Sequence, residues 1–153
     1  MNLIVLNGSP KGDLSVTLQY VRYAARKFAG HSFQIFPVAQ TIGKLEKDEK
    51  AFDDIMDAVK KADAVLWCFP LYFLLVCSQY KRFIELIFER KRSDAFAGKY
   101  TASLSTSIHF FDHTAHNYMH AICDDLSMNY LGGYSPAMYD LMKKPERDRW
   151  LHF

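Results

Sequence analysis

Short apolar runs alternate along the chain with longer segments in which apolar residues recur every three or four positions. The runs Leu3–Leu6 and Ala64–Phe69 are continuously apolar, as expected of strands buried on both faces of a parallel sheet. Phe33–Val38, Tyr100–Ser105 and Met128–Leu131 predict three further strands. The chain therefore offers five strands, separated by segments with the period of helices.

Helical periodicity follows each of the first four strands. The first helix has Ser15 or Asp13 as its cap, and Ser78 and Asp112 are expected to cap the third and fourth. Before the second helix, residues 44–50 are highly charged and are expected to be solvated. Pro37 near the end of the second strand suits a sheet edge. This order predicts an α/β fold with a parallel five-stranded sheet covered on both faces.

The C-terminal residues predict the start of one more helix. Pro145 stands in its first turn, followed by Glu146, and the chain stops at Phe153 after about two turns. We expect this last helix to lack part of its length and the chain to be a fragment. No linker or repeat divides the sequence, so residues 1–153 are expected to form a single domain.

Composition narrows the class of protein. Half of the 153 residues are hydrophobic and 15% are aromatic, which excludes a disordered chain. The net charge of +2 gives no reason to expect a nucleic-acid or membrane partner. Three scattered cysteines and the absence of a signal-peptide pattern at the start predict a reduced, cytoplasmic protein without a metal cluster.

The segment after the first strand, Gly8–Thr17, has the composition of an anion-binding loop. Gly8 and Gly12 allow tight curvature, Ser9, Ser15 and Thr17 supply hydroxyl groups, and Lys11 supplies a charge. A helix N-terminus at the end of the loop would direct N–H groups at an anion. The spacing matches neither the nucleoside-triphosphate loop nor the dinucleotide fingerprint. An ordinary strand-to-helix turn rich in capping residues is the alternative.

Three motifs together resemble one family. The first motif is Gly8-Ser9-Pro10-Lys11 followed by Ser15 and Thr17, and the second is Pro70-Leu71-Tyr72-Phe73 leading to Lys81-Arg82-Phe83-Ile84-Glu85. The third is Ser105-Thr106-Ser107. All three are similar to motifs of the NADPH-dependent FMN reductase family. The resemblance implies a flavodoxin-like, doubly wound sandwich that binds FMN. It places all three motifs at the carboxyl ends of strands, where ligands of open parallel sheets collect.

The resemblance also implies roles for residues. The FMN phosphate would be held by Ser9, Lys11, Ser15, Val16 and Thr17. The ribityl chain and the flavin ring would contact Pro70, Leu71, Tyr72 and Phe73 on one side and Ser105, Thr106, Ser107 and Phe110 on the other. His109 is the candidate catalytic residue, and Tyr139 and Asp140 are further candidates at the same edge. Tyr72 and Phe73 are alternatively simple core aromatics.

Four histidines recur at helical spacing, at positions 109, 113, 116 and 120. They fall on an arc about 130° from the centre of the apolar stripe, so we expect them to face away from the core. Spacings of three and four residues suit metal chelation, but no carboxylate or cysteine completes a ligand set. We predict no metal and interpret the arc as a solvated or subunit-facing stripe.

These expectations combine into an oxidoreductase. The resemblance implies that NADPH or NADH passes a hydride to bound FMN, which then reduces a quinone, a flavin or another small acceptor. It also implies a homodimer, with the aromatic segments 72–76 and 110–111 as the candidate interface. The alternatives are a flavodoxin-type electron carrier, a flavin domain of a larger redox protein, and a domain that has lost FMN.

Overall fold

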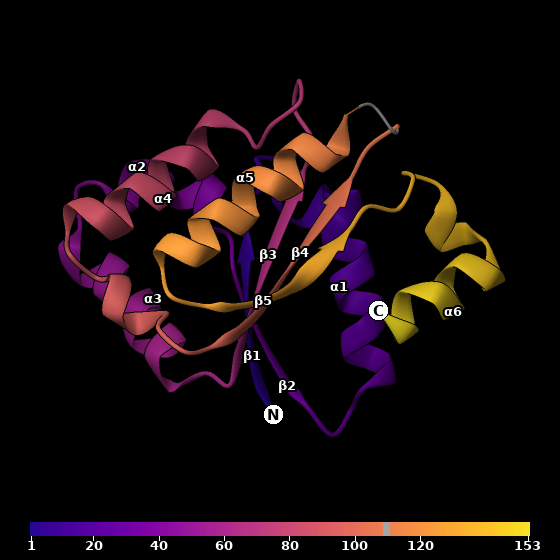
Figure 1. Cartoon of the computed structure of the whole chain (residues 1–153), viewed down its shortest axis with the longest axis horizontal. Coiled ribbons are helices and arrows are strands. Elements are labelled where there is room, and N and C mark those ends of the chain that lie inside the picture. The colour runs from indigo at the N-terminus through magenta and orange to yellow at the C-terminus, as the bar shows by residue number, and fades with distance from the viewer. Residues whose placement is uncertain (109–110) are drawn as a thin grey trace.

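The computed structural model describes residues 1–108 and 111–153 (Figure 1). Its five strands form one parallel sheet in the order β2-β1-β3-β4-β5. The strands are β1 (Asn2–Asn7), β2 (Ser32–Phe36), β3 (Ala64–Pro70), β4 (Tyr100–Thr106) and β5 (Asn129–Tyr134). The helices described are α1 (Val16–Lys27), α2 (Val38–Leu45), α3 (Glu49–Lys61), α4 (Ser78–Glu89), α5 (Asp112–Asp125) and α6 (Lys144–His152). The predicted flavodoxin-like α/β sheet is confirmed, with β2 at one edge.

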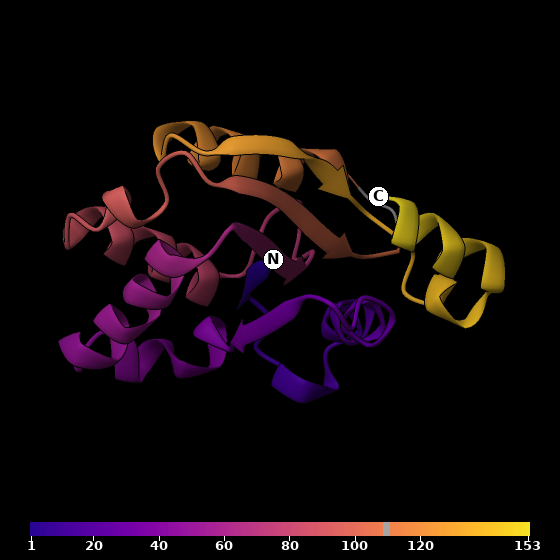
Figure 2. The ribbon, with the colours of Figure 1, turned by 90° about the horizontal axis from the view of Figure 1, so that it is seen from below.

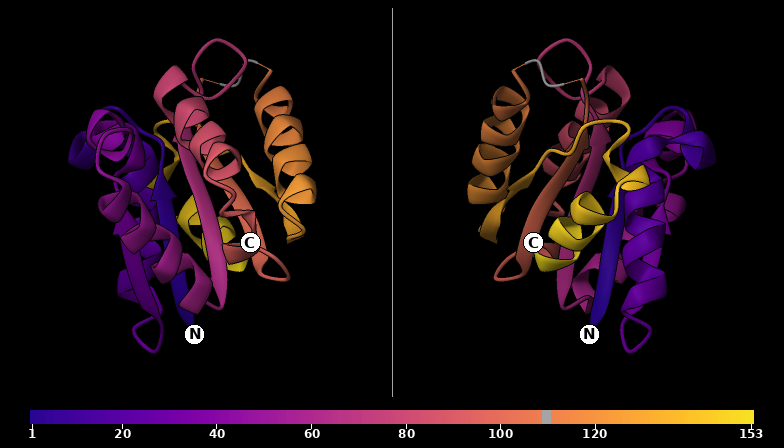
Figure 3. Two further views of the ribbon diagram at one scale, coloured as in Figure 1. Left: turned by 90° about the vertical axis from the view of Figure 1, so that its left-hand side faces the viewer. Right: turned by 90° about the vertical axis from the view of Figure 1, so that its right-hand side faces the viewer.

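Helices cover both faces of the sheet (Figures 2 and 3). On one face, α1 and α6 pack against residues such as Val5 and Leu66. On the other, α2 to α5 pack against Ile4, Leu6 and Trp67. Successive residues of a strand point to opposite faces, so an uninterrupted apolar run supplies both cores.

Several boundaries differ from the sequence expectations, and the helix α2 was not expected, because β2 ends at Phe36 and Val38, predicted to lie in the strand, begins this helix. Part of the charged stretch 44–50 is helical, because α2 continues to Leu45 and Asp48 caps α3 by accepting the Ala51 N–H at 3.0 Å. The fifth strand runs on through Gly132 and Gly133 to Tyr134, beyond the predicted end at Leu131. The caps of α4 and α5 are Cys77 and Phe111, one residue before the predicted ones.

The last helix is present and packed. Trp150 of α6 is buried, and its indole Nε1 donates a hydrogen bond to the Tyr20 carbonyl of α1 at 2.9 Å. Its ring stacks on Tyr134 with centroids 5.3 Å apart. These contacts hold α6 against α1 (Figure 1). Within residues 1–108 and 111–153, no helix combines the length and apolarity that crossing a membrane would require.

Candidate active site

The loop between β1 and α1 is shaped by two close contacts with glycine. A Cβ on Gly8 would lie 2.5 Å from the ring of Tyr80, which is buried beneath the loop. A Cβ on Gly12 would lie 2.2 Å from the side chain of Gln40, and Gly12 also has a φ of +51°. Position 8 therefore requires glycine because the buried ring cannot move aside, whereas at Gly12, where the exposed Gln40 side chain can move, the positive φ is what favours glycine. The loop curls over Tyr80 into a short 3₁₀ turn, Gly12–Leu14.

The loop leads directly into the N-terminus of α1. Ser15 is the cap, and its hydroxyl accepts the Leu18 N–H at 3.4 Å, which decides between the two predicted caps. Thr17 in the first turn is buried, and its hydroxyl lies 2.5 Å from that of Thr106 at the end of β4. The first-turn N–H groups of a helix have no partners within the helix and attract anions.

The charges beside this loop favour an anion. Lys11 is exposed within it. The nearby carboxylate of Asp13 is paired with Arg22 at 2.5 Å, so its negative charge is largely compensated. Together with the helix dipole, the exposed ammonium gives the loop a positive potential.

A two-residue hairpin follows β3. Tyr72 and Leu75 exchange backbone hydrogen bonds of 2.8 and 3.1 Å, and the turn residues Phe73 and Leu74 have φ values of +41° and +73°. Such turns normally use asparagine and glycine. Phe73 is 91% exposed at the tip, and Tyr72 is 41% exposed, so neither is a core aromatic. The hairpin presents both rings at the carboxyl end of the sheet.

Backbone and side-chain contacts join the three segments. The Leu71 N–H donates to the Thr106 carbonyl at 3.2 Å. Beyond β4, Ser107 pairs with Ala137, and the Met138 N–H donates to the Ser107 carbonyl at 3.1 Å. The hairpin, the end of β4 and the segment after β5 are therefore fixed side by side, at the end of the sheet opposite the N-terminus (Figure 3).

These segments enclose a cavity of about 460 Å³, a volume typical of small-molecule sites. Most of the predicted cofactor residues line it: Ser9, Lys11, Ser15, Val16, Thr17, Pro70, Leu71, Tyr72, Phe73, Thr106 and Ser107. Four lining residues were not predicted: Leu14, Leu74, Ile108 and Met138. The first three adjoin predicted motifs. Met138 could have been found from its place after β5, because the carboxyl ends of all parallel strands meet at this edge.

Three predicted residues lie elsewhere or outside the described residues. Ser105 does not line the cavity; its hydroxyl is bonded to His116 at 2.9 Å and to Ser135 at 3.0 Å. His109 and Phe110 lie outside the described residues. Of the further candidates, Tyr139 is exposed outside the cavity lining, and the Asp140 carboxylate accepts the Ala137 N–H at 2.9 Å.

The histidine stripe is only partly solvated. His113 and His120 are exposed, as predicted. The expectation was wrong for His116, which is half-buried between α5 and the sheet and hydrogen-bonded to Ser103 and Ser105. Burial lowers the pKa of His116, and the charge of Asp112 opposes this shift in part. Among the described residues, no three histidine, cysteine or acidic side chains converge in a way that could hold a metal ion.

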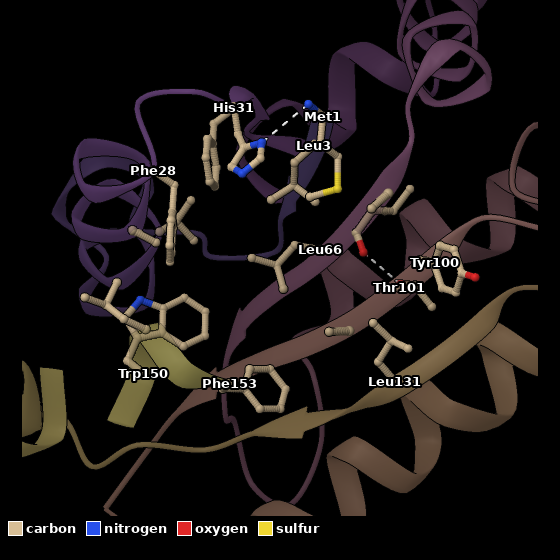
Figure 4. A pocket seen from close by; sticks show the side chains of 17 residues that line it. Met1, Leu3, Phe28, His31, Leu66, Tyr100, Thr101, Leu131, Trp150 and Phe153 are labelled. Carbon is tan, nitrogen blue, oxygen red and sulfur yellow. Dashed lines mark hydrogen bonds between the residues drawn. The ribbon is translucent and has the colours of Figure 1, made fainter. Parts of the chain in front are cut away.

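A second hollow, of about 340 Å³, lies near the amino ends of the central strands (Figure 4). Its lining is mostly apolar, with Leu3, Leu66 and Phe153 among it, and two of its polar groups already have partners. The ring of His31 accepts from the Met1 amino group at 3.4 Å, and the Thr101 hydroxyl donates to the Val65 carbonyl at 2.8 Å. The hollow lies far from the loop that attracts anions.

The fold is flavodoxin-like, and its cavity has a positive end beside the N-terminus of α1 and largely apolar walls. The sequence model of the family described as NADPH-dependent FMN reductase matches residues 1–139. The chain therefore belongs to this family. It is a flavin-dependent oxidoreductase with FMN as its cofactor.

Solved structures share this fold at low sequence identity. An NADH:FMN oxidoreductase in its apo form aligns with a TM-score of 0.78 and 15% identity, over 99% of this chain and 84% of that one. An NADPH-quinone reductase from P. pentosaceus gives 0.74 and 15%, over 99% and 94%. An FMN-dependent NADH-azoreductase from Bacillus anthracis, in complex with FMN, gives 0.71 and 12%, over 99% and 93%. The search of curated proteins found no significant match.

Proposed function

We propose that the chain, acting as one domain over residues 1–153, binds FMN in the 460 Å³ cavity and reduces a small acceptor at the expense of NADPH or NADH. The observation that carries the proposal is the convergence of three segments, far apart in sequence, on one cavity with a polar end and an apolar side. The NADH:FMN oxidoreductase, quinone reductase and azoreductase of the same fold support it by analogy.

The residues of the cavity fit the cofactor. Lys11 and the first turn of α1 would hold the phosphate, since both favour an anion. Tyr72 and Phe73 would cover one face of the ring and exclude water from it. FMN supplies the hydride chemistry when bound, and the protein binds it, orients it and leaves room for nucleotide and acceptor. The acceptor we propose is a quinone, a free flavin or a similarly small molecule.

Anaerobic titration of the purified protein tests the activity. A yellow protein bleached by NADPH or NADH would support the reductase. A yellow protein that neither nucleotide bleaches would contradict it and favour an electron carrier. A protein that binds no added FMN would overturn the assigned site.

A lysine substitution tests the phosphate end separately. Lys11→Ala should raise the Kd for FMN about three- to tenfold, because an exposed ammonium makes a modest, charge-assisted contact. It should leave the Kd for riboflavin, which lacks the phosphate, unchanged. Lys27→Ala, at the far end of α1, is the matched control. Equal losses for FMN and riboflavin would contradict the assignment of Lys11 to the phosphate.

We also propose a homodimer in the cytoplasm, formed through the rim of the cavity. Leu14, Phe73 and Ile108 on this rim are 85%, 91% and 81% exposed. Clustered apolar side chains with such exposure mark interaction surfaces. Light scattering should give a dimer for the wild type and a monomer for Phe73→Asp. A dimer unaffected by this charge would place the interface elsewhere.

A further inference from the structure

Of the three described histidines of the stripe, His116 is the one that lies between α5 and the sheet, and both of its ring nitrogens have partners. Nδ1 lies 2.6 Å from the Ser103 hydroxyl and Nε2 lies 2.9 Å from the Ser105 hydroxyl. The ring also lies against Gly133 of β5, where a Cβ would be 2.3 Å from Nδ1. A glycine in the middle of a strand commonly marks such a close approach. The imidazole thus occupies a defined place beneath α5, against β4 and β5 of the sheet.

The direction of the hydrogen bonds follows from the chemistry of their last member. Ser135 donates its only hydroxyl proton to the carboxylate of Asp112, which can only accept. Ser135 must then accept from Ser105, at 3.0 Å, and Ser105 in turn must accept from His116. The ring proton of the neutral imidazole is therefore on Nε2.

The hydrogen bonds continue on the opposite side of the His116 ring, at Nδ1. Since Nδ1 carries no proton in this tautomer, it accepts from the Ser103 hydroxyl. Ser103 then accepts from the Tyr130 hydroxyl, 2.5 Å away. Burial favours the neutral form of His116 by lowering its pKa. Every hydroxyl group in this series of hydrogen bonds donates toward the Asp112 carboxylate, so donor and acceptor are assigned at each bond.

Two members of this series of hydrogen bonds, Ser105 and Ser135, stand shortly before segments of the cavity wall in the sequence. Ser105 precedes Thr106 and Ser107, which line the cavity. Ser135 stands shortly before Met138, which also lines it and whose N–H binds the Ser107 carbonyl. The end of β4 and the segment after β5 are thus connected behind the wall by the hydrogen bond between the two serines, and His116 donates to Ser105, the β4 member of that pair.

We propose that His116 is a positioning residue for the flavin site: its neutral, Nε2-protonated ring, oriented by Asp112 through two serines, holds the β4 end and the segment after β5 in the geometry of the cavity wall. The inference rests on the proposed FMN site. His116 does not line the cavity itself and acts only through Ser105 and Ser135.

Fluorescence titration of the apoprotein with FMN provides the first test. His116→Phe keeps a ring of similar size but leaves the serine hydroxyls without their partner, and should raise the Kd for FMN about tenfold or more. His116→Gln offers an amide N–H and an amide oxygen to the same two serines, and should bind within about threefold of wild type. His113→Phe, on the exposed side of the same helix, is the matched control and should bind as wild type.

The outcomes separate a positioning role from a structural one. Equal losses in the Phe and Gln variants, or a folded His116→Phe protein with wild-type affinity, would overturn the proposal. Nitrogen NMR of the His116 ring in the wild-type apoprotein tests the tautomer without any substitution, and a proton on Nδ1 would also overturn it. If the wild type binds no FMN, the proposed function fails, whereas the tautomer still decides whether the chain of hydrogen bonds exists.

Discussion

Replacing Gly8 with alanine would force a methyl group into the packed contact between the loop and Tyr80. The new Cβ would lie 2.5 to 2.7 Å from three atoms of the ring, where ordinary contact begins at 3.4 Å. The ring cannot retreat, because it is fully buried and its hydroxyl donates to the Leu6 carbonyl at 2.7 Å. Three aromatic side chains also surround it: Trp67, Phe69 and Phe83. The loop must therefore lift by about 1 Å, and overpacking of this kind costs about 1–3 kcal/mol.

Urea denaturation measures this cost as a lowered free energy of unfolding. Gly43→Ala is the control, since no atom lies within 4 Å of its Cβ and its position inside α2 favours alanine by about 0.5–1 kcal/mol. In the double variant Gly8→Ala/Tyr80→Leu the smaller side chain gives the methyl group room. The combined loss should then be smaller than the sum of the two single losses. An unchanged free energy in Gly8→Ala, or strict additivity, would refute the reasoning.

Three further predictions concern other parts of the fold. Because burial lowers the pKa of His116, the unfolded state binds a proton at this group more readily than the native state does as the pH falls. The free energy of unfolding should therefore decrease below about pH 6.5, by at most about 1.4 kcal/mol per pH unit for this one group. His116→Gln should lack this part of the pH dependence, and a difference between the two proteins that stays constant from pH 7.5 to 5.5 would contradict the shift. Trp150→Ala should lower the free energy of unfolding by about 3–5 kcal/mol, as expected for a buried tryptophan, and a loss below about 1 kcal/mol would contradict the packing of α6. Burial raises the pKa of the thiols of Cys68, Cys77 and Cys123. The native protein should therefore react slowly with a disulfide reagent until urea is added, and a thiol that reacts rapidly in the native protein would contradict this.

The strands and most of the cavity could be predicted from the sequence because both depend on local patterns. An apolar run such as Leu3–Leu6 identifies a strand buried on both faces, whatever covers it. Parallel strands then bring their carboxyl ends to one edge, so the loops after β1, β3 and β4 had to meet. The positive φ of Gly12 and the Ser15 cap are likewise properties of a short segment, whereas Gly8 is required by its contact with the distant Tyr80.

What the sequence could not decide was the direction in which individual side chains point. Ser105 and Thr106 are adjacent on a strand and must face opposite sides of the sheet, but only the packed helices show which side is which. Thr106 faces Thr17 of α1, and Ser105 faces His116 of α5.

His116 shows the same limit most clearly. Its place on the helix, away from the apolar stripe, predicts exposure, and the predicted fifth strand stops at Leu131, before Gly133. In the tertiary structure each explains the other: the glycine at 133 lets the ring approach β5, and two serines of β4 satisfy its nitrogens. The sequence by itself determined the sheet and the loops that form the site. Only the tertiary structure decided which polar side chains are buried behind it, because such burial depends on partners from distant parts of the chain.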